Sequence, residues 1–263
     1  MAMRSRSPLK FFLLTFALAI PFWVVGGMVN LQILLGLPLA ALMFVCPGLA
    51  ALVLVREESG PTEAKALLKK ALDYKSISAN IWYAPILLLT PAISVLAYLT
   101  LRATGTHVPI PKISVLPTLA LFAIFFVTAS GEELGWSGYA LDPLQQRSNS
   151  LMAGLLLGTV WAAWHWLPLV QIHRSVEWIA WWTLWSISAR VIMTCLYNRS
   201  GRSVFGAVLY HAVSNVCWQS FPVHGSFFDP RATGLITTFV AVVASIAWGP
   251  RTVAGQARRA WVD

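Results

Sequence analysis

Apolar residues gather into long runs along the chain, and short polar segments separate these runs. The runs cover residues 11–29, 31–55, 81–101, 115–141, 150–171, 177–198, 203–221 and 233–249. Most are close to the roughly 20 residues that an α-helix needs to cross the hydrocarbon core of a bilayer. The pattern predicts an all-α, polytopic membrane protein of about eight transmembrane helices, in a single transmembrane domain over residues 1–263.

Composition supports this prediction and narrows the surroundings of the protein. Hydrophobic residues make up 57% of the chain and charged residues 11%, whereas about a quarter of an ordinary soluble domain is charged. The formal net charge of +9 would suit a nucleic-acid partner, but the cations lie between the apolar runs, where they act as topology signals. We therefore expect the lipid bilayer, and no nucleic acid, as a partner.

The distribution of Lys and Arg predicts which ends of the helices face the cytoplasm. An eight-helix path with the N-terminus inside places fourteen cations in cytoplasmic segments: Arg4, Arg6, Lys10, Arg56, Lys65, Lys69, Lys70, Lys75, Arg147, Arg199, Arg202, Arg251, Arg258 and Arg259. Only Arg102, Lys112, Arg174 and Arg231 fall on the outer side. Cytoplasmic loops carry the excess of Lys and Arg, so both termini are predicted to be cytoplasmic. In a prokaryote the location would be the plasma membrane.

Two further segments carry a prediction of their own. Residues 56–80 repeat apolar positions at helical spacing among lysines, which predicts an amphipathic segment on the cytoplasmic surface. Trp178, Trp181 and Trp182 open the sixth run, where an aromatic belt of interfacial anchors is expected.

A few ionisable or polar residues interrupt the middle runs. Glu132 and Glu133 lie in the fourth run, His165 in the fifth, Arg190 in the sixth, and His211 with Asn215 in the seventh. A charge near the middle of a bilayer costs at least about 2.5 kcal/mol, so such residues indicate a functional site by default. His211 and Asn215 are one turn apart and share a helix face, whereas the adjacent glutamates diverge, so we expect one glutamate to face the histidines.

Three short motifs on these runs resemble a known family, the CPBP or Abi group of intramembrane proteases, which are similar to type II CAAX prenyl endopeptidases. The family pattern Glu-Glu-x-x-x-Arg-Gly-aromatic corresponds to Glu132 through Tyr139. The pattern Phe-x-x-x-His corresponds to Trp161 and His165, and His-x-x-x-Asn corresponds to His211 and Asn215. The resemblance covers a motif-bearing core at about residues 115–222.

The resemblance implies an endopeptidase that hydrolyses a peptide bond of a membrane-associated protein or peptide. It assigns Glu132 as the general base for a water molecule and His165 as the residue that positions this water. His211 and Asn215 would donate hydrogen bonds to the developing oxyanion. Amide hydrolysis requires both a base and fixed donors where negative charge appears, so these residue types suit the chemistry.

The first motif departs from the family at one position, where Ser137 stands in place of the arginine. That arginine would pair with Glu133, and the only other cation within a predicted helix is Arg190. We therefore predict that Arg190 pairs with Glu133 from the neighbouring helix. In this scheme Glu133, Ser137, Arg190 and Trp161 surround the four catalytic candidates.

The residues leave a second mechanism and two other functions open. Glu132, His165 and His211 would also form a two-histidine, one-carboxylate ligand set for a divalent metal such as zinc; the metal-free mechanism is preferred, and no cofactor is assigned. A non-catalytic immunity or scaffold protein of the same fold is the first alternative function. A transporter is the second, although no duplicated half is evident.

Overall fold

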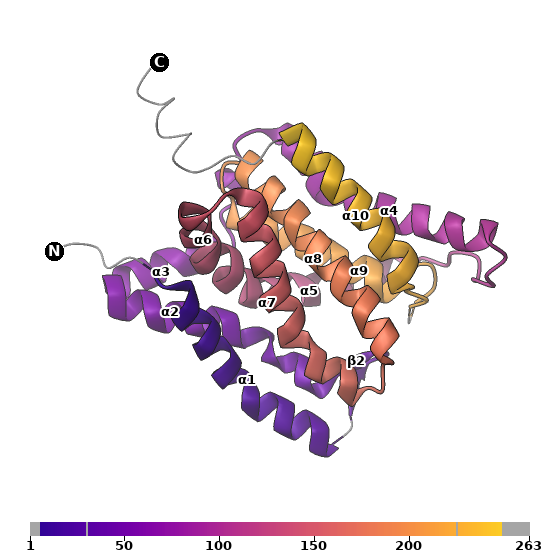
Figure 1. The fold of residues 1–263 in the computed structure, drawn as a ribbon, viewed down its shortest axis with the longest axis horizontal. Coiled ribbons are helices and arrows are strands. Elements are labelled where there is room, and N and C mark those ends of the chain that lie inside the picture. The colour runs from indigo at the N-terminus through magenta and orange to yellow at the C-terminus, as the bar shows by residue number, and fades with distance from the viewer. Residues whose placement is uncertain (1–5, 30, 225, 249–263) are drawn as a thin grey trace.

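A computed structural model describes residues 6–29, 31–224 and 226–248, and this part of the chain is almost entirely helical. Its ten α-helices (Figure 1) are α1 (Pro8–Val29), α2 (Val45–Ser59), α3 (Pro61–Lys69), α4 (Tyr83–Ala103), α5 (Val115–Gly135), α6 (Leu141–Arg147), α7 (Ser150–Gln171), α8 (Val176–Arg199), α9 (Val204–Ser220) and α10 (Pro230–Trp248). Short 3₁₀ segments are η1 (Leu39–Phe44), η2 (Tyr74–Ser76) and η3 (Asn80–Trp82), and η4 (Trp136–Ala140) is a π-helix. The all-α prediction is confirmed.

Eight helical segments correspond to the eight apolar runs. Seven are long and apolar enough to cross a bilayer: Pro8–Val29, Leu39–Ser59, Asn80–Ala103, Val115–Arg147, Ser150–Gln171, Val176–Arg199 and Pro230–Ala247. The eighth, α9, has 17 residues, which is the lower end of the range for a membrane-crossing helix. The prediction of an integral, multi-pass membrane protein is therefore confirmed for the described residues.

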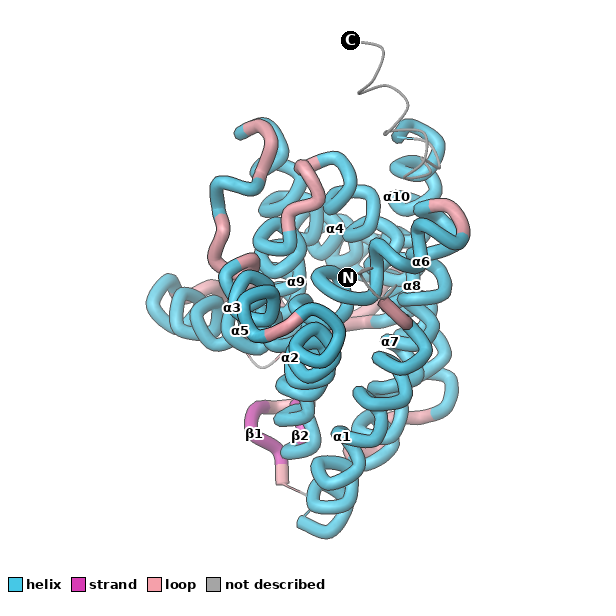
Figure 2. The backbone as a smooth tube through the Cα atoms, turned by 90° about the vertical axis from the view of Figure 1, so that its left-hand side faces the viewer, coloured by secondary structure: helices cyan, strands magenta, loops and turns pink. Residues whose placement is uncertain are grey.

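The second run differs from its prediction at its beginning. Residues expected to be helical form two short antiparallel strands, β1 (Gln32–Leu34) and β2 (Leu37–Pro38), and Figure 2 shows them at one end of the molecule near α1 and α2. Gly36 has a φ of 74°, which glycine adopts at low cost, and Pro38 disfavours helical geometry in the residue before it. Apolarity alone does not reveal this turn.

The fourth run also differs, because its helix continues through η4 and α6 to Arg147. The π-helix contains the second half of the first motif, from Trp136 to Tyr139. All five η4 residues are buried. Single π-turns inside α-helices are frequent at functional sites.

Glycine lets α2 and α5 approach closely beside the two glutamates. A Cβ atom added at Gly135 would lie 2.4 Å from the carbonyl oxygen of Pro47, and one at Gly131 would lie 2.9 Å from that of Phe44. On the other side of the bundle, a Cβ at Gly158 of α7 would lie 2.9 Å from the Cα of Ile187 in α8. Because glycine has no side chain at these positions, the backbones of α2 and α5, and those of α7 and α8, can pack in close contact.

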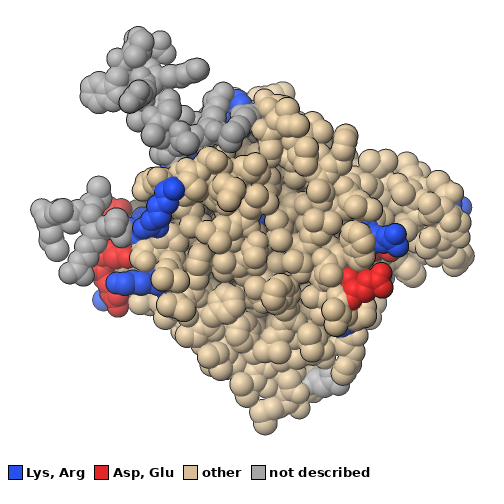
Figure 3. All heavy atoms as spheres, viewed as in Figure 1, with Lys and Arg blue, Asp and Glu red and all other residues tan. Residues whose placement is uncertain are grey.

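Charged side chains gather at two opposite ends of the face shown in Figure 3, and few appear between them. This is the distribution expected of a bundle surrounded by lipid. The cytoplasmic placement of the termini stays a prediction, and Arg4, Arg251, Arg258 and Arg259 lie outside the described residues.

Within residues 56–80, α3 is shorter than the predicted segment, because α2 extends to Ser59. Its Leu67 is buried, and Leu67 Cδ1 would lie 3.0 Å from a Cβ added at Gly138. The apolar face of α3 therefore packs on the π-helix at this point. The boundaries 56–80 and 115–222 stay predictions.

Candidate active site

A cavity of about 650 Å³ lies inside the bundle, and α5, α7 and α9 bring the four predicted catalytic residues to its wall. Glu132 comes from α5, His165 from α7, and His211 with Asn215 from α9. The remaining lining is mostly aliphatic and aromatic: Ile33, Leu34, Gly36, Leu37, Pro38, Ala41, Leu42, Met43, Phe44, Ala123, Ile124, Phe125, Val127, Thr128, Trp161, Trp164, Pro168, Leu169, Trp182, Trp185 and Trp218. A few convergent polar groups in an apolar pocket are typical of a binding or active site.

Glu132 lies on the cavity wall with one carboxylate oxygen already engaged. The indole Nε1 of Trp161 donates to Glu132 Oε2 over 2.8 Å. Among the described residues, no donor is bonded to Oε1. Trp161 occupies the position of the family's phenylalanine, and a phenylalanine could not donate this hydrogen bond. The aromatic exchange in the second motif therefore adds a polar contact to the proposed base.

The hydrogen bond of His165 determines which of its ring nitrogens is free. Nδ1 lies 2.8 Å from the carbonyl oxygen of Trp161, one turn earlier on α7. A carbonyl oxygen only accepts, so Nδ1 carries the proton and Nε2 is left as an acceptor. The His165 ring packs against Trp164 and Trp182, with centroids 4.8 and 5.3 Å away.

Glu133 is fully buried and accepts four hydrogen bonds behind the cavity wall. Arg190 donates to both oxygens, from Nη1 to Oε2 over 2.8 Å and from Nη2 to Oε1 over 2.9 Å. The hydroxyl of Ser137 donates to Oε2. Nδ1 of His211 lies 2.9 Å from Oε1. The predicted pairing of Arg190 with Glu133 is confirmed.

The expectation that only one glutamate faces the histidines is wrong. Glu133 bonds directly to His211, whereas Glu132 lines the cavity together with both histidines. The two carboxylates do diverge around the helix, as their adjacent positions require. Glu133 points toward the face of α5 on which α8 and α9 pack. The order of apolar and polar residues along the chain does not reveal that packing.

Arg190 and Trp161 join the buried network to the cavity wall. The guanidinium carbon of Arg190 lies 4.4 Å from the Trp161 ring centroid, and the same ring lies edge-on to His211 at 5.3 Å. A cation over an indole face is attracted by the ring quadrupole. Trp161 thus contacts Arg190 and His211 with its ring and Glu132 with its indole nitrogen.

Asn215 follows His211 by one turn of α9 and lines the same cavity. No hydrogen bond engages its side-chain amide within the described part of the chain. The sharing of one helix face by His211 and Asn215, predicted from their spacing, is confirmed by their common cavity.

Sequence reasoning missed much of the aromatic lining. Trp182 is 6% exposed and packs against His165, so its interpretation as an interfacial anchor is wrong. Trp185 and Trp218 also line the cavity. A signal was present, because Trp178, Trp182 and Trp185 recur on one helix face. The cavity lining from β1, β2 and η1 had no such signal.

The three residues of the alternative metal set, Glu132, His165 and His211, line the same cavity. Among the described residues, no group of three or more His, Cys, Asp or Glu side chains could hold a metal ion. Glu132 Oε2 is engaged by an indole rather than left for a cation. As placed, the three side chains are not arranged as a metal site, and the metal-dependent alternative stays a prediction.

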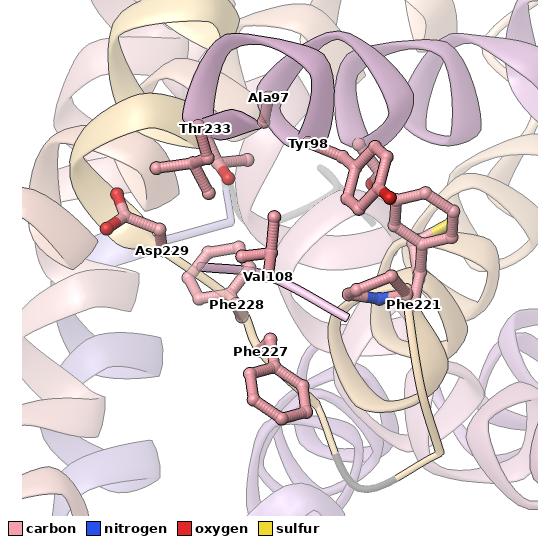
Figure 4. Close-up of a pocket in the computed structure, with 12 residues that line it drawn as sticks. Ala97, Tyr98, Val108, Phe221, Phe227, Phe228, Asp229 and Thr233 are labelled. Atoms are coloured by element: carbon pink, nitrogen blue, oxygen red, sulfur yellow. The ribbon is translucent and has the colours of Figure 1, made fainter. Parts of the chain in front are cut away.

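A second cavity, of about 30 Å³, lies between α4, the end of α9 and the beginning of α10 (Figure 4). Its lining is mainly aromatic and aliphatic, and its carboxylate, Asp229, accepts a hydrogen bond from the backbone nitrogen of Ala232 at the beginning of α10. None of the predicted site residues reaches it.

Fold and site together define an integral, multi-pass, all-α membrane protein with a polar cluster on an apolar internal cavity. A family model described as "Type II CAAX prenyl endopeptidase Rce1-like" matches residues 114–217, which contain all three motifs. The chain is also 27% identical over 235 residues to "CAAX prenyl protease 2" of Methanococcus maripaludis, over 80% of this chain and 83% of that protein. These two matches confirm the resemblance to the CPBP family of type II CAAX prenyl endopeptidase-like proteins.

Proposed function

We propose that the chain is an intramembrane endopeptidase in which Glu132 activates a water molecule for attack on a peptide bond. The observation that carries this proposal is the meeting of Glu132, His165, His211 and Asn215 on one cavity wall, although they come from three helices. The resemblance to proteins named for proteolysis supports it.

The acceptor atoms that remain free in the site suit a bound water and a base. Glu132 Oε1 and His165 Nε2 are both acceptors without a protein donor in the described chain, so a water between them would be oriented by its two hydrogens. Glu132 takes one proton as the water oxygen bonds to the carbonyl carbon. When the carbon–nitrogen bond breaks, the same proton passes to the leaving amine.

The oxyanion would form beside α9. The Asn215 amide is a donor in every protonation state of the site. His211 donates from Nε2 only in the form that carries a proton on both ring nitrogens, because Nδ1 is already bonded to Glu133. Fixed donors in a mostly apolar cavity stabilise a developing charge better than mobile water does.

The substrate would reach this cavity sideways from the lipid. Leu42 of η1 and Ile124 and Val127 of α5 line the cavity and are 41%, 52% and 63% exposed. The wall between η1 and α5 is therefore the side through which a membrane-associated peptide would enter. A prenylated peptide, in line with the name "CAAX prenyl protease 2" of the relative, suits the apolar lining.

The test is cleavage of a quenched fluorescent peptide library by the purified protein in detergent. We expect wild type to cleave some of its members. Glu132→Gln should lose about 1000-fold in rate, because the amide cannot take the proton. His211→Ala should lose about 100-fold.

Glu57→Gln is the matched control, since it makes the same exchange at an exposed carboxylate. It should cleave at the wild-type rate. Cleavage that survives both Glu132→Gln and His211→Ala would contradict the assigned site. No cleavage by any form, against prenylated and unmodified peptides alike, would overturn the proposal in favour of a non-catalytic membrane protein.

A further inference from the structure

We infer that Arg190, on a helix that carries none of the three motifs, is the positioning residue that fixes the His211 ring through Glu133. The inference rests on the proposed function for its kinetic consequence, but its structural part stands on contacts alone. In the resembled motif, the cation that pairs with Glu133 would stand four residues later, where this chain has Ser137. The inference gives that role to a residue of α8.

The contacts form a closed buried chain from Arg190 to His211. Arg190, Glu133 and His211 are 1%, 0% and 3% exposed. The bidentate guanidinium fixes the plane of the carboxylate, because two parallel N–H···O bonds leave it no rotation. With that plane fixed, Oε1 lies 2.9 Å from His211 Nδ1.

This hydrogen bond decides how His211 meets the cavity. An ionised carboxylate only accepts, so His211 must carry a proton on Nδ1, and Nε2 is the nitrogen left for substrate. Arg190 touches neither the substrate space nor His211 by any hydrogen bond in the described chain. Its side-chain hydrogen bonds go to Glu133 and to the sulfur of Met193, and its guanidinium also lies over the Trp161 ring.

Packing explains how a residue of α8 reaches this point. A Cβ added at Gly158 of α7 would lie 3.1 Å from the Cβ of Arg190. The absence of a side chain at Gly158 lets α8 approach α7 and brings the start of the Arg190 side chain into the bundle interior. Ser137 is small and already bonds to Glu133, so its Cβ points toward the same carboxylate.

If this inference is correct, a guanidinium should fix the Glu133 carboxylate either from position 190 or from position 137. We would compare Arg190→Leu with the double variant Ser137→Arg/Arg190→Leu, which returns one guanidinium to the motif position and vacates the space of the other. Two readouts apply: the ¹⁵N signal of the His211 ring in histidine-labelled protein, assigned by loss in His211→Gln, and the kcat and KM of peptide cleavage.

Arg190→Leu should change the His211 signal from a proton fixed on Nδ1 to one shared between the nitrogens. It should lower kcat about 100-fold with KM within about twofold, since a misplaced donor affects the transition state more than substrate binding. The double variant should restore the Nδ1 signal and recover at least about tenfold in kcat. Arg102→Leu, at an exposed arginine on α4, is the control and should change neither.

Other outcomes are also decisive. An unchanged His211 signal in Arg190→Leu would overturn the inference, as would equal defects in the folded single and double variants. Should Arg190→Leu fail to fold, Arg190→Lys keeps the buried positive charge and Glu133 but loses the two parallel hydrogen bonds of the guanidinium. A wild-type His211 signal in that variant would overturn the inference, and an altered one would support it. If the wild-type protein cleaved nothing, the proposed function would be contradicted. The His211 signal would still decide the role of Arg190.

Discussion

Two polar regions lie a few ångströms apart in this protein, and they differ in how completely their atoms are bonded. Behind the cavity wall, Glu133 accepts four hydrogen bonds and is inaccessible. On the wall, Glu132 has a single indole partner, and Asn215 has none in the described chain. Satisfied buried charges hold a structure together, whereas unsatisfied polar atoms facing a cavity are available to a ligand. Adjacent residues of one motif thus lie in two different settings, Glu133 in a bonded buried network and Glu132 on the cavity wall.

The largest effect should come from breaking the buried region. Arg190→Met should lower the free energy of unfolding by about 3–5 kcal/mol, because it leaves the Glu133 carboxylate buried without its cation. Chemical unfolding in mixed micelles measures this. Arg102→Met, at an exposed arginine on α4, should change it by less than about 0.5 kcal/mol. A stability equal to wild type in Arg190→Met would show that the ion pair does not hold the bundle.

The second-largest effect should come from a residue on the cavity wall. It should lower the rate of cleavage without lowering the stability of the protein. Asn215→Ala should lower kcat about 100-fold, the usual cost of losing one oxyanion donor. Its unfolding free energy should stay within about 0.5 kcal/mol of wild type, since the amide bonds to nothing in the described protein. Peptide cleavage and unfolding on one preparation check both numbers. A large stability loss would place Asn215 with the buried region instead.

A third variant tests whether the backbone contact between α2 and α5 positions both regions. Gly135→Ala would place a Cβ 2.4 Å from the Pro47 carbonyl oxygen, so the helices must separate. We expect a loss of about 2 kcal/mol in stability, as for overpacked cores, together with slower cleavage.

Gly206→Ala is the control, because its nearest neighbour would be the flexible end of Ile86 at 3.3 Å. It should be neutral or slightly stabilising. If Gly135→Ala behaved like Gly206→Ala, close packing at Gly135 would not matter to the site.

The smallest effect should come from Trp161→Phe, which returns the second motif to the family residue. Losing the indole donor to Glu132 should lower kcat about tenfold, since a hydrogen bond to a charged group contributes roughly 1.5 kcal/mol or more. The ring stacking on Arg190 would remain, so unfolding should shift little. Steady-state cleavage measures it, and an unchanged kcat would mean that the indole bond does not orient Glu132.

The sequence predicted the helices well because lipid imposes a simple rule on composition. A long apolar run that crosses a bilayer as a helix satisfies its own backbone hydrogen bonds, so the approximate positions of the helices followed from residue types alone. The Gly36 turn in the second run and the π-helix after Glu133 did not follow, because both depend on local backbone geometry that apolarity does not encode.

The site was predictable to the extent that charge in a membrane is costly. This argument selected Glu132, Glu133, His165, Arg190 and His211. The pairing of Arg190 with Glu133 was predicted from the departure at Ser137 from the resembled motif. The cost of charge did not tell which glutamate would contact His211, since that depends on how α8 and α9 pack around α5. Nor did it find Trp182, because tryptophan is equally at home in an interfacial belt.

The most direct test of the account compares Glu132→Gln with Glu133→Gln in one preparation, by peptide cleavage and by unfolding. Glu132→Gln should unfold like wild type and cleave about 1000-fold more slowly, because it keeps an acceptor for Trp161 but loses the base. Glu133→Gln should lose about 3 kcal/mol or more of stability, because Arg190 is left without its counter-charge. Cleavage by Glu132→Gln at the wild-type rate would contradict the assignment of Glu132 as the base.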